Sequence, residues 1–144
     1  MSLESRIRAL QRSTLFSTVS ETDLIALAET MREERFAKGE IVCTEGEQAD
    51  RVFIVMSGGL EVRVAENSGR TVHLQHGDLF GEYGLFDEGL RTATVASLHE
   101  SVLLTLDYDR FRAFLLVFPE AMLAILSGTI KQLLTSQRRS RQIR

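Results

Sequence analysis

Residues 77–97 are the most informative stretch of the chain, and they read GDLFGEYGLFDEGLRTATVAS. The apolar pair before Gly81 predicts the end of a strand, and Gly81 permits a tight turn with a close approach of the backbone. A short helix over residues 82–89 would point its first N–H groups at whatever lies above that turn, which favours an anion. Arg91 follows nine residues after Glu82, and its guanidinium fork suits phosphate oxygens.

Glu82 adds an acceptor to this predicted anion site. A carboxylate beside a phosphate is repelled unless a cation such as Arg91 offsets the charge. It can then accept a hydrogen bond from a ligand hydroxyl. A ligand that carries an anion and a hydroxyl on one ribose is a sugar phosphate. The alternative is a structural ion pair between Glu82 and Arg91 with no ligand at all.

Short apolar runs separated by glycines surround this stretch and predict a β-rich fold. The predicted strands are residues 40–43, 52–57, 60–64, 71–74, 92–97 and 102–106. Several of them alternate apolar and polar residues, as in LEVRV at 60–64, which is the pattern of a half-buried strand. Evenly spaced strands with glycine turns are typical of a sandwich or a barrel.

Helical patterns stand on both sides of these strands. Residues 3–11 and 21–31 are predicted helices, the second because its apolar residues recur at helical spacing. Asp107 is a predicted N-cap for a helix over 108–117. Pro119 suits the first turn of one more helix, where its missing N–H costs nothing.

That last helix carries a seam of apolar residues spaced three and four apart, namely Leu123, Leu126, Ile130 and Leu133. Such spacing is that of a coiled-coil seam. Two interpretations stay open. The seam packs on the strands, or it meets its copy in a homodimer.

Composition indicates one ordinary globular domain. The chain has 144 residues, of which 44% are hydrophobic and 26% charged, with a net charge of −3. This acidic balance disfavours non-specific binding of DNA. The single cysteine, Cys43, excludes an internal disulfide and a four-cysteine zinc site. No membrane span is expected, because Pro119 interrupts the apolar stretch 114–130, and a cytoplasmic location is expected.

Two motifs at the fixed spacing described above carry a resemblance to a known family. Phe-Gly-Glu at 80–82 and Arg-Thr-Ala-Thr-Val at 91–95 resemble the phosphate-binding cassette of the cyclic-nucleotide-binding domain family. That family includes the bacterial catabolite activator proteins and the regulatory subunits of cAMP-dependent kinase. The resemblance covers about residues 14–138, which is nearly the whole chain.

The resemblance implies an α+β fold. We expect an eight-stranded antiparallel β-roll, jelly-roll-like, with N-terminal helices, a short cassette helix and two C-terminal helices. The chain, residues 1–144, is then a single domain. It is expected to comprise N-terminal helices within residues 1–35, a β-roll over residues 36–107 that holds the cassette 80–95, and C-terminal helices over residues 108–144.

The resemblance also implies the ligand contacts. Glu82 is similar to the residue that accepts the ribose 2′-hydroxyl, and Arg91 resembles the residue that pairs with the cyclic phosphate. The implied ligand-binding set is Phe80, Gly81, Glu82, Tyr83, Gly84, Arg91, Thr92 and Ala93. The candidates to cover the base are Thr135 and Ser136. The favoured ligand is cAMP, and cGMP is the alternative because the Thr92 hydroxyl suits a guanine.

The implied function is regulatory and not enzymatic, with no metal or other cofactor. Binding of a cyclic nucleotide is relayed through the C-terminal helices to an unknown effector protein or a missing effector domain. We expect no DNA-binding domain in this chain, because only five residues follow Arg139.

Two alternative functions stay open. One is a ligand-free domain for dimerisation or interaction through the apolar seam. The other is a metal-dependent enzyme resembling the cupins, with His73, His76 and Glu82 as ligands. The two histidines are three residues apart and would face opposite sides of a strand, which disfavours the metal site.

Overall fold

The computed structural model describes residues 2–63, 71–82 and 89–127. The helical elements before the sheets are α1 (Leu3–Arg12), the 3-10 turn η1 (Thr14–Phe16) and α2 (Glu21–Thr30). The strands are β1 (Arg32–Phe36), β2 (Ile41–Cys43), β3 (Arg51–Ser57), β4 (Leu60–Arg63), β5 (Thr71–Leu74), β6 (Leu79–Phe80), β7 (Thr94–Ser97) and β8 (Ser101–Asp107). Helix α4 (Tyr108–Val117) follows, and residues 119–127 are again helical.

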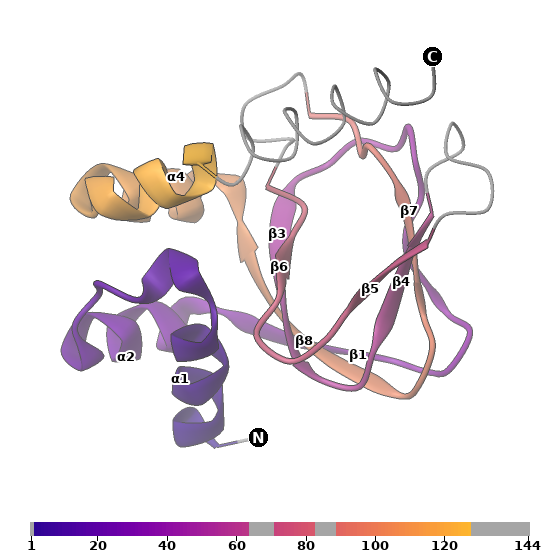
Figure 1. The fold of residues 1–144 in the computed structure, drawn as a ribbon, viewed down its shortest axis with the longest axis horizontal. Helices are drawn as coiled ribbons and strands as arrows, with labels where there is room; N and C mark the ends of the chain where they lie inside the picture. Colours follow the sequence, from indigo (N-terminus) through magenta and orange to yellow (C-terminus); the bar gives the residue numbers. More distant parts are fainter. Residues whose placement is uncertain (1, 64–70, 83–88, 128–144) are drawn as a thin grey trace, which may run out of the picture.

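The strands form two four-stranded antiparallel sheets that face each other. Their orders are β1-β8-β3-β6 and β2-β7-β4-β5, and Figure 1 shows the two sheets enclosing a roll with the helices gathered on one side. This arrangement confirms the predicted eight-stranded antiparallel β-roll. The predicted cassette helix falls on residues 82–89, and residues 83–88 lie outside the described segments of the chain.

Strands β3 and β8 are apolar along nearly their whole length because both of their faces are buried. In β3, Phe53 and Val55 belong to the core inside the roll, whereas Val52, Ile54 and Met56 belong to the core on the helix side. Successive side chains of a strand point to opposite faces, and β8 is divided in the same way. These two strands therefore separate two hydrophobic cores.

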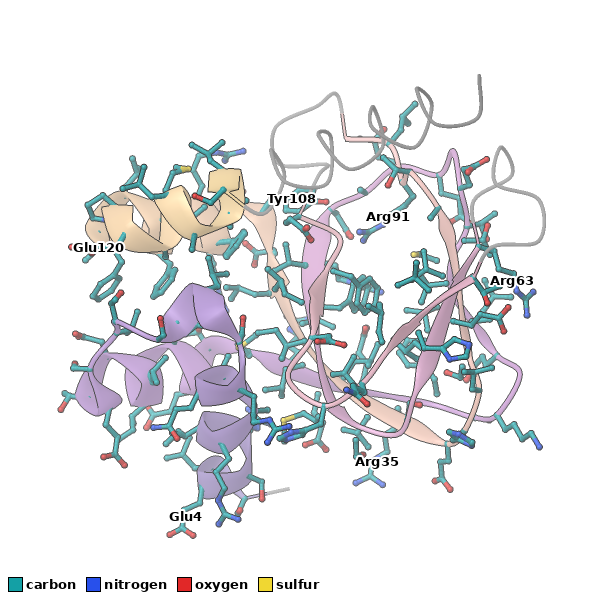
Figure 2. All side chains as sticks on the ribbon, viewed as in Figure 1. Glu4, Arg35, Arg63, Arg91, Tyr108 and Glu120 are labelled. Carbon is teal, nitrogen blue, oxygen red and sulfur yellow. The ribbon has the colours of Figure 1, made fainter. Side chains whose placement is uncertain are left out.

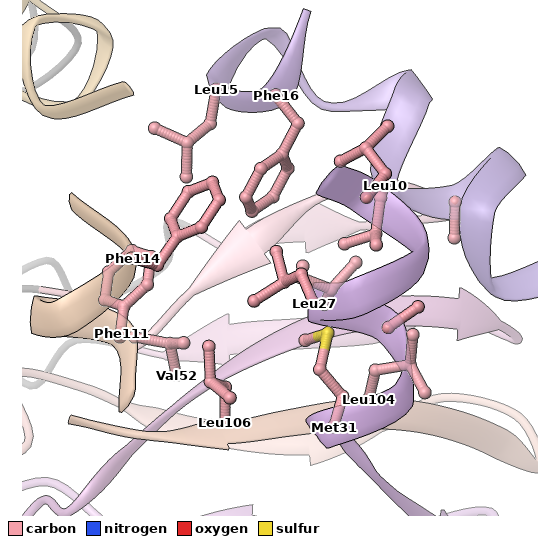
Figure 3. Packing of buried hydrophobic residues seen from close by; sticks show 14 of the residues in the cluster. Leu10, Leu15, Phe16, Leu27, Met31, Val52, Leu104, Leu106, Phe111 and Phe114 are labelled. Carbon is pink, nitrogen blue, oxygen red and sulfur yellow. The ribbon is translucent and has the colours of Figure 1, made fainter. Parts of the chain in front are cut away.

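The larger core joins the helices to the outer face of β3 and β8. Helices α1, α2 and α4, which are far apart in the sequence, all contribute to it, and Figure 3 shows their side chains converging over the strands. The rings of Phe16 and Phe114 lie 5.5 Å apart. Because α4 shares this core with α1 and α2, the helices before and after the roll form one packed unit.

The β-roll begins before residue 36, the start that the sequence predicts for it, because most of strand β1 precedes that position. The roll begins at Arg32, inside the segment 1–35 that was expected to be helical. The sequence REERF lacks the apolar alternation by which strands are recognised. β1 lies at the edge of its sheet, where charged side chains are common because they prevent pairing with other chains. Glu34 of this strand forms an ion pair with Arg51 at 3.3 Å.

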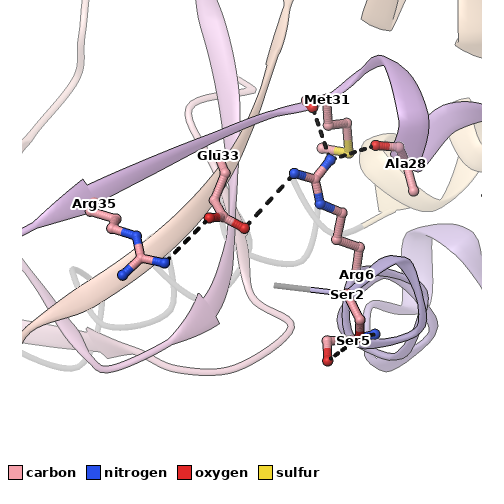
Figure 4. A network of polar contacts seen from close by, with 7 residues as sticks. All are labelled: Ser2, Ser5, Arg6, Ala28, Met31, Glu33 and Arg35. Atoms are coloured by element: carbon pink, nitrogen blue, oxygen red, sulfur yellow. Dashed lines mark hydrogen bonds and ion pairs between the residues drawn. The ribbon is translucent and has the colours of Figure 1, made fainter.

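Arg6 fastens helix α1 to the end of α2 and to β1. Its Nη1 donates to the carbonyls of Ala28 at 3.0 Å and Met31 at 3.1 Å. Its Nη2 lies 3.8 Å from the Glu33 carboxylate, as Figure 4 shows. The last carbonyls of a helix lack partners within the helix, so the Arg6 guanidinium completes the C-terminus of α2.

The helix ends agree closely with the predicted ranges. Helix α4 spans the predicted residues 108–117, and Asp107 is its N-cap. In the next helix Ile125 is buried, whereas Leu123 is 63% exposed and Leu126 42% exposed. The described half of the apolar seam is therefore open to solvent, and Ile130 and Leu133 lie outside the described residues. None of the described helices is long and apolar enough to cross a membrane.

Replacing Asp107 by alanine should destabilise the protein by about 1 kcal/mol. The Asp107 carboxylate accepts a hydrogen bond from the Arg110 N–H at 2.8 Å, and the alanine variant leaves that donor without a partner. Urea unfolding followed by circular dichroism measures the change. Asp107→Asn keeps the acceptor and should stay close to wild type, as should the control Asp109→Ala on the same exposed turn. If Asp107→Asn loses as much stability as Asp107→Ala, then the negative charge of Asp107, and not its capping hydrogen bond, stabilises the protein.

Candidate functional site

Six of the eight predicted ligand-binding residues are described, namely Phe80, Gly81, Glu82, Arg91, Thr92 and Ala93. Outside the described residues lie Tyr83, Gly84, Thr135 and Ser136. The structure brings Gly81 at the end of β6 against the guanidinium of Arg91. Glu82 is the next residue, so both charged residues that the sequence singled out lie at the same end of the roll.

Arg91 is held in place by its backbone. Its N–H donates to the Glu47 carbonyl at 2.8 Å, and its carbonyl accepts from the Gly46 N–H at 2.8 Å. The preceding residue, Leu90, forms an antiparallel bridge with Gln48. The segment before β7 is thereby fixed to the loop between β2 and β3. The Arg91 side chain points into the space between the two sheets (Figure 2).

The guanidinium of Arg91 is buried but incompletely paired. Its side chain is 7% exposed, and its Nη2 lies 3.9 Å from a carboxylate oxygen of Asp50. Its Cζ lies 5.1 Å from the ring centroid of Phe53, within the range of a cation–π contact. Nη1 is buried without a hydrogen-bond partner in the described chain. A buried charged donor without an acceptor is costly, so this atom is placed to receive an acceptor from outside the chain.

Gly81 makes the close approach to Arg91 possible. Its φ is +88°, a region that residues with a side chain rarely adopt. A Cβ at this position would lie 2.6 Å from Nη1 of Arg91 and 3.2 Å from the carbonyl oxygen of Arg51. Only glycine lets the backbone after β6 lie this close to the guanidinium.

One carboxylate oxygen of Glu82 is also buried. This atom, Oε2, has no hydrogen-bond partner among the described residues. Burial raises the pKa of the Glu82 carboxyl, because the charged form loses its hydration, and the residue's own backbone N–H offsets part of that rise. Within the described chain, the ion pair of Arg91 is with Asp50 and not with Glu82. The geometry therefore does not support the structural ion pair that the sequence left as an alternative.

Three neighbours of this site escaped the sequence analysis: Asp50, Phe53 and Tyr108. The Tyr108 hydroxyl donates to the Gly81 carbonyl at 2.5 Å, and the Tyr108 N–H donates to the Asp50 carbonyl at 3.0 Å. Burial raises the pKa of the Tyr108 phenol, while the Arg91 charge lowers it. Only the pairing of β3 with β8 brings these residues together, so no local pattern in the sequence marks them.

The remaining candidate groups have no catalytic arrangement in the described residues. The Cys43 thiol lies 3.9 Å from the Ala93 carbonyl. Burial raises its pKa despite the opposing charge of Arg91. His73 and His76 are exposed. Among the described residues, no group of three or more His, Cys, Asp and Glu side chains is arranged to hold a metal ion.

Most of the chain is similar in sequence to known proteins. The family model of the cyclic nucleotide-binding domain matches residues 33–117. The chain is 31% identical over 114 residues to the CRP-like cAMP-activated global transcriptional regulator of Mycobacterium tuberculosis, an alignment that covers 77% of this chain and 51% of that protein. It is 33% identical over 104 residues to the cAMP-dependent protein kinase regulatory subunit of Mycosarcoma maydis, covering 67% of this chain and 20% of that protein. The chain thus spans about half the length of the first relative and a fifth of the second.

A solved structure extends the likeness to almost the whole chain. The N-terminal domain of a transcriptional regulator from Streptomyces coelicolor A3(2) superposes with a TM-score of 0.70 at 30% identity, covering 91% of this chain and 93% of that one. The region matched by the family model runs from β1 to the end of α4 and includes Gly81, Glu82 and Arg91. The chain belongs to the cyclic nucleotide-binding domain family.

Proposed function

We propose that this chain is a regulatory module that binds a cyclic nucleotide through Arg91 and Glu82. One observation carries the proposal: beside Gly81, Nη1 of the buried Arg91 has no acceptor and the buried Oε2 of Glu82 has no donor among the residues that the structure describes. A ligand that offers both phosphate oxygens and a hydroxyl meets both needs at once. Membership of the family supports a cyclic nucleotide as that ligand.

Each residue then has a defined role in binding. Nη1 of Arg91 donates to an oxygen of the cyclic phosphate, and Asp50 orients the other side of the guanidinium. Glu82 accepts from the ribose 2′-hydroxyl. Gly81 leaves room for the phosphate beside the backbone. Hydrogen bonds to charged groups are shorter and stronger than neutral ones, so these two contacts supply most of the specificity for a ribose cyclic phosphate.

We propose cAMP as the preferred nucleotide and cGMP as the alternative. The relative from Mycobacterium tuberculosis is named as cAMP-activated, which supports cAMP. Thr92 is exposed directly after Arg91, and its hydroxyl suits a guanine amino group, which supports cGMP. The candidates to cover the base, Thr135 and Ser136, lie outside the described residues and stay a prediction.

The nucleotide acts as a signal and is not converted. A ligand shifts a conformational equilibrium only by the difference between its affinities for the two states. In this chain the states differ in how α4 and the following helix sit on the helix-side core. A further domain or a separate protein reads that difference, and the chain itself needs no catalytic group.

The exposed leucines of the last described helix support a second candidate, a module for dimerisation. Leu123 and Leu126 lie open to solvent although they begin the predicted seam. Sedimentation velocity with and without cAMP tests it. A dimer that forms in both conditions, together with no nucleotide binding in a titration, would favour dimerisation as the function. A dimer whose stability depends on cAMP would join both functions in one switch.

Replacing Arg91 by alanine should weaken nucleotide binding about ten- to hundredfold or more, because hydrogen bonds to charged groups contribute about 1.5–3 kcal/mol. The measurement is calorimetric titration of the nucleotide-stripped protein with cAMP and with cGMP. Arg91→Lys keeps the charge but loses the planar fork and should fall between wild type and alanine. Arg112→Ala, which removes an exposed arginine of α4, is the control. Equal affinity in Arg91→Ala and wild type would contradict the assignment of the phosphate contact.

Replacing Glu82 by glutamine should stabilise the nucleotide-free protein at neutral pH. Burial raises the folded-state pKa of this carboxyl above its unfolded value. The contribution of the Glu82 carboxyl to stability is therefore complete at pH values below its pKa in the unfolded chain. It is lost as the pH rises through its pKa in the folded protein. Glutamine cannot ionise, so the variant should exceed wild type at neutral pH and match it in acid. Thermal unfolding midpoints across this range test the prediction, and a difference that does not vary with pH would refute it.

A ligand analogue tests the hydroxyl partner of the same residue. A neutral amide oxygen is a weaker acceptor than a carboxylate. Removing the ribose 2′-hydroxyl from cAMP should thus reduce the affinity of wild type more than that of Glu82→Gln. The difference between the two reductions measures the coupling between the residue 82 side chain and the hydroxyl. An equal reduction in both proteins would place the hydroxyl elsewhere.

A further inference from the structure

Tyr108 is the residue at which the candidate ligand site and helix α4 meet. It is the first residue of α4, directly after the N-cap Asp107. Its hydroxyl donates to the Gly81 carbonyl at 2.5 Å, and Figure 2 shows Tyr108 and Arg91 at the same end of the roll. A single side chain therefore links the backbone beside the guanidinium to the first turn of a helix on the other side of the sheet.

The backbone of Tyr108 makes a second link to the same site. Its N–H donates to the Asp50 carbonyl at 3.0 Å, and the Asp50 carboxylate lies 3.9 Å from Nη2 of Arg91. The charges of Arg91, Glu82 and Asp50 all act on the Tyr108 phenol, which places the ring within their reach. Both segments that flank the guanidinium are thus bonded to one tyrosine.

Other residues of α4 attach the helix to α1, α2 and the core that they share. Phe111 is fully buried in the helix-side core, and the ring of Phe114 lies 5.5 Å from that of Phe16. Nη1 of Arg110 donates to the Thr30 carbonyl at the end of α2 at 3.0 Å. A displacement of the first turn of α4 therefore acts on contacts with α1 and α2, because packed interiors do not deform continuously.

We propose that the Tyr108 hydroxyl transmits occupancy of the ligand site to helix α4 through its hydrogen bond to the Gly81 carbonyl. The inference rests on the proposed function, since it needs a ligand at Arg91 and Glu82. A ligand that contacts both of these side chains fixes the Gly81 peptide between them, and the hydrogen bond passes that constraint to the first turn of α4. Tyr108 contacts protein and not ligand, so it is a positioning residue.

The test compares Tyr108→Phe with wild type by amide hydrogen exchange of the intact chain, with and without cAMP. Phenylalanine keeps the ring and removes only the hydroxyl. Arg112→Ala, which removes an exposed arginine of the same helix, is the matched control. In wild type and in the control, cAMP should slow or redistribute exchange in α4. In Tyr108→Phe, cAMP should bind with a loss of about tenfold or less, the range of one neutral hydrogen bond, while the response of α4 disappears.

Each other outcome overturns a separate element of the inference. A full response of α4 in Tyr108→Phe would show that transmission runs by another route. A loss of affinity far beyond about tenfold would make Tyr108 a member of the ligand contact and not a transmitter. If wild type binds neither cAMP nor cGMP, the proposed function is wrong, and the proposed transmission through Tyr108 is then wrong as well.

Comparison of the nucleotide-free proteins tests the link itself without any ligand. Exchange at the first turn of α4 should be faster in Tyr108→Phe than in Arg112→Ala, because a restraint on that turn has been removed. Equal exchange in the two variants would mean that the hydrogen bond does not restrain the helix, which would overturn the inference whatever the nucleotide does.

Discussion

In the part of the chain that the structure describes, the buried guanidinium of Arg91 has no acceptor for its Nη1, and this constraint governs the chemistry of the candidate site. Charged side chains are rarely buried unless they are paired, and within the described residues Arg91 has a long ion pair with the exposed Asp50 and the face of Phe53 beside it. Its backbone is bonded to the loop between β2 and β3, which fixes the point from which the side chain enters the roll. An anion that fills the free donor lowers the free energy of the folded state, so that binding and stabilisation are the same event.

The position of Arg91 follows from the two cores that β3 and β8 separate. The guanidinium lies against Phe53 on the inner face of β3, while the neighbouring side chains of that strand face the helices. The candidate ligand site and the core shared by the helices thus lie on opposite faces of the same strand. At the end of the roll Tyr108 of α4 reaches the Gly81 carbonyl directly. Under the proposed transmission, this one hydrogen bond connects the candidate site to the helices.

Local chemistry explains what the sequence could predict. A carboxylate suited to an N-cap marked the start of α4 at Asp107, and an apolar pair before Gly81 marked the end of β6. The apolar runs of β3 and β8 showed strands because both faces are buried. The pair Glu82 and Arg91 was found because its chemistry and spacing lie within one stretch of chain. The cassette helix and the residues that cover the base remain predictions.

The features that the sequence did not reveal all depend on contacts between distant segments. β1 consists mostly of charged residues and becomes a strand because β8 pairs with it. Asp50 and Tyr108 look like ordinary surface residues in the sequence, and they meet because Arg51 stands opposite Asp107 in the register of β3 and β8. The whole sheet determines this strand pairing, so a short stretch of neighbouring residues does not carry the information that would predict it.

The alternation along β3 also bears on how such a module diversifies. Within one segment of seven residues, the positions that face the interior of the roll and the positions that face the helices are interleaved. Substitutions at one set can alter what the helices pack against while the other set preserves the interior of the roll. A common interior can in this way serve outputs as different as a transcriptional regulator and a kinase subunit. An engineer who wished to attach the roll to a new output would rewrite every second residue of two strands and leave the intervening ones untouched.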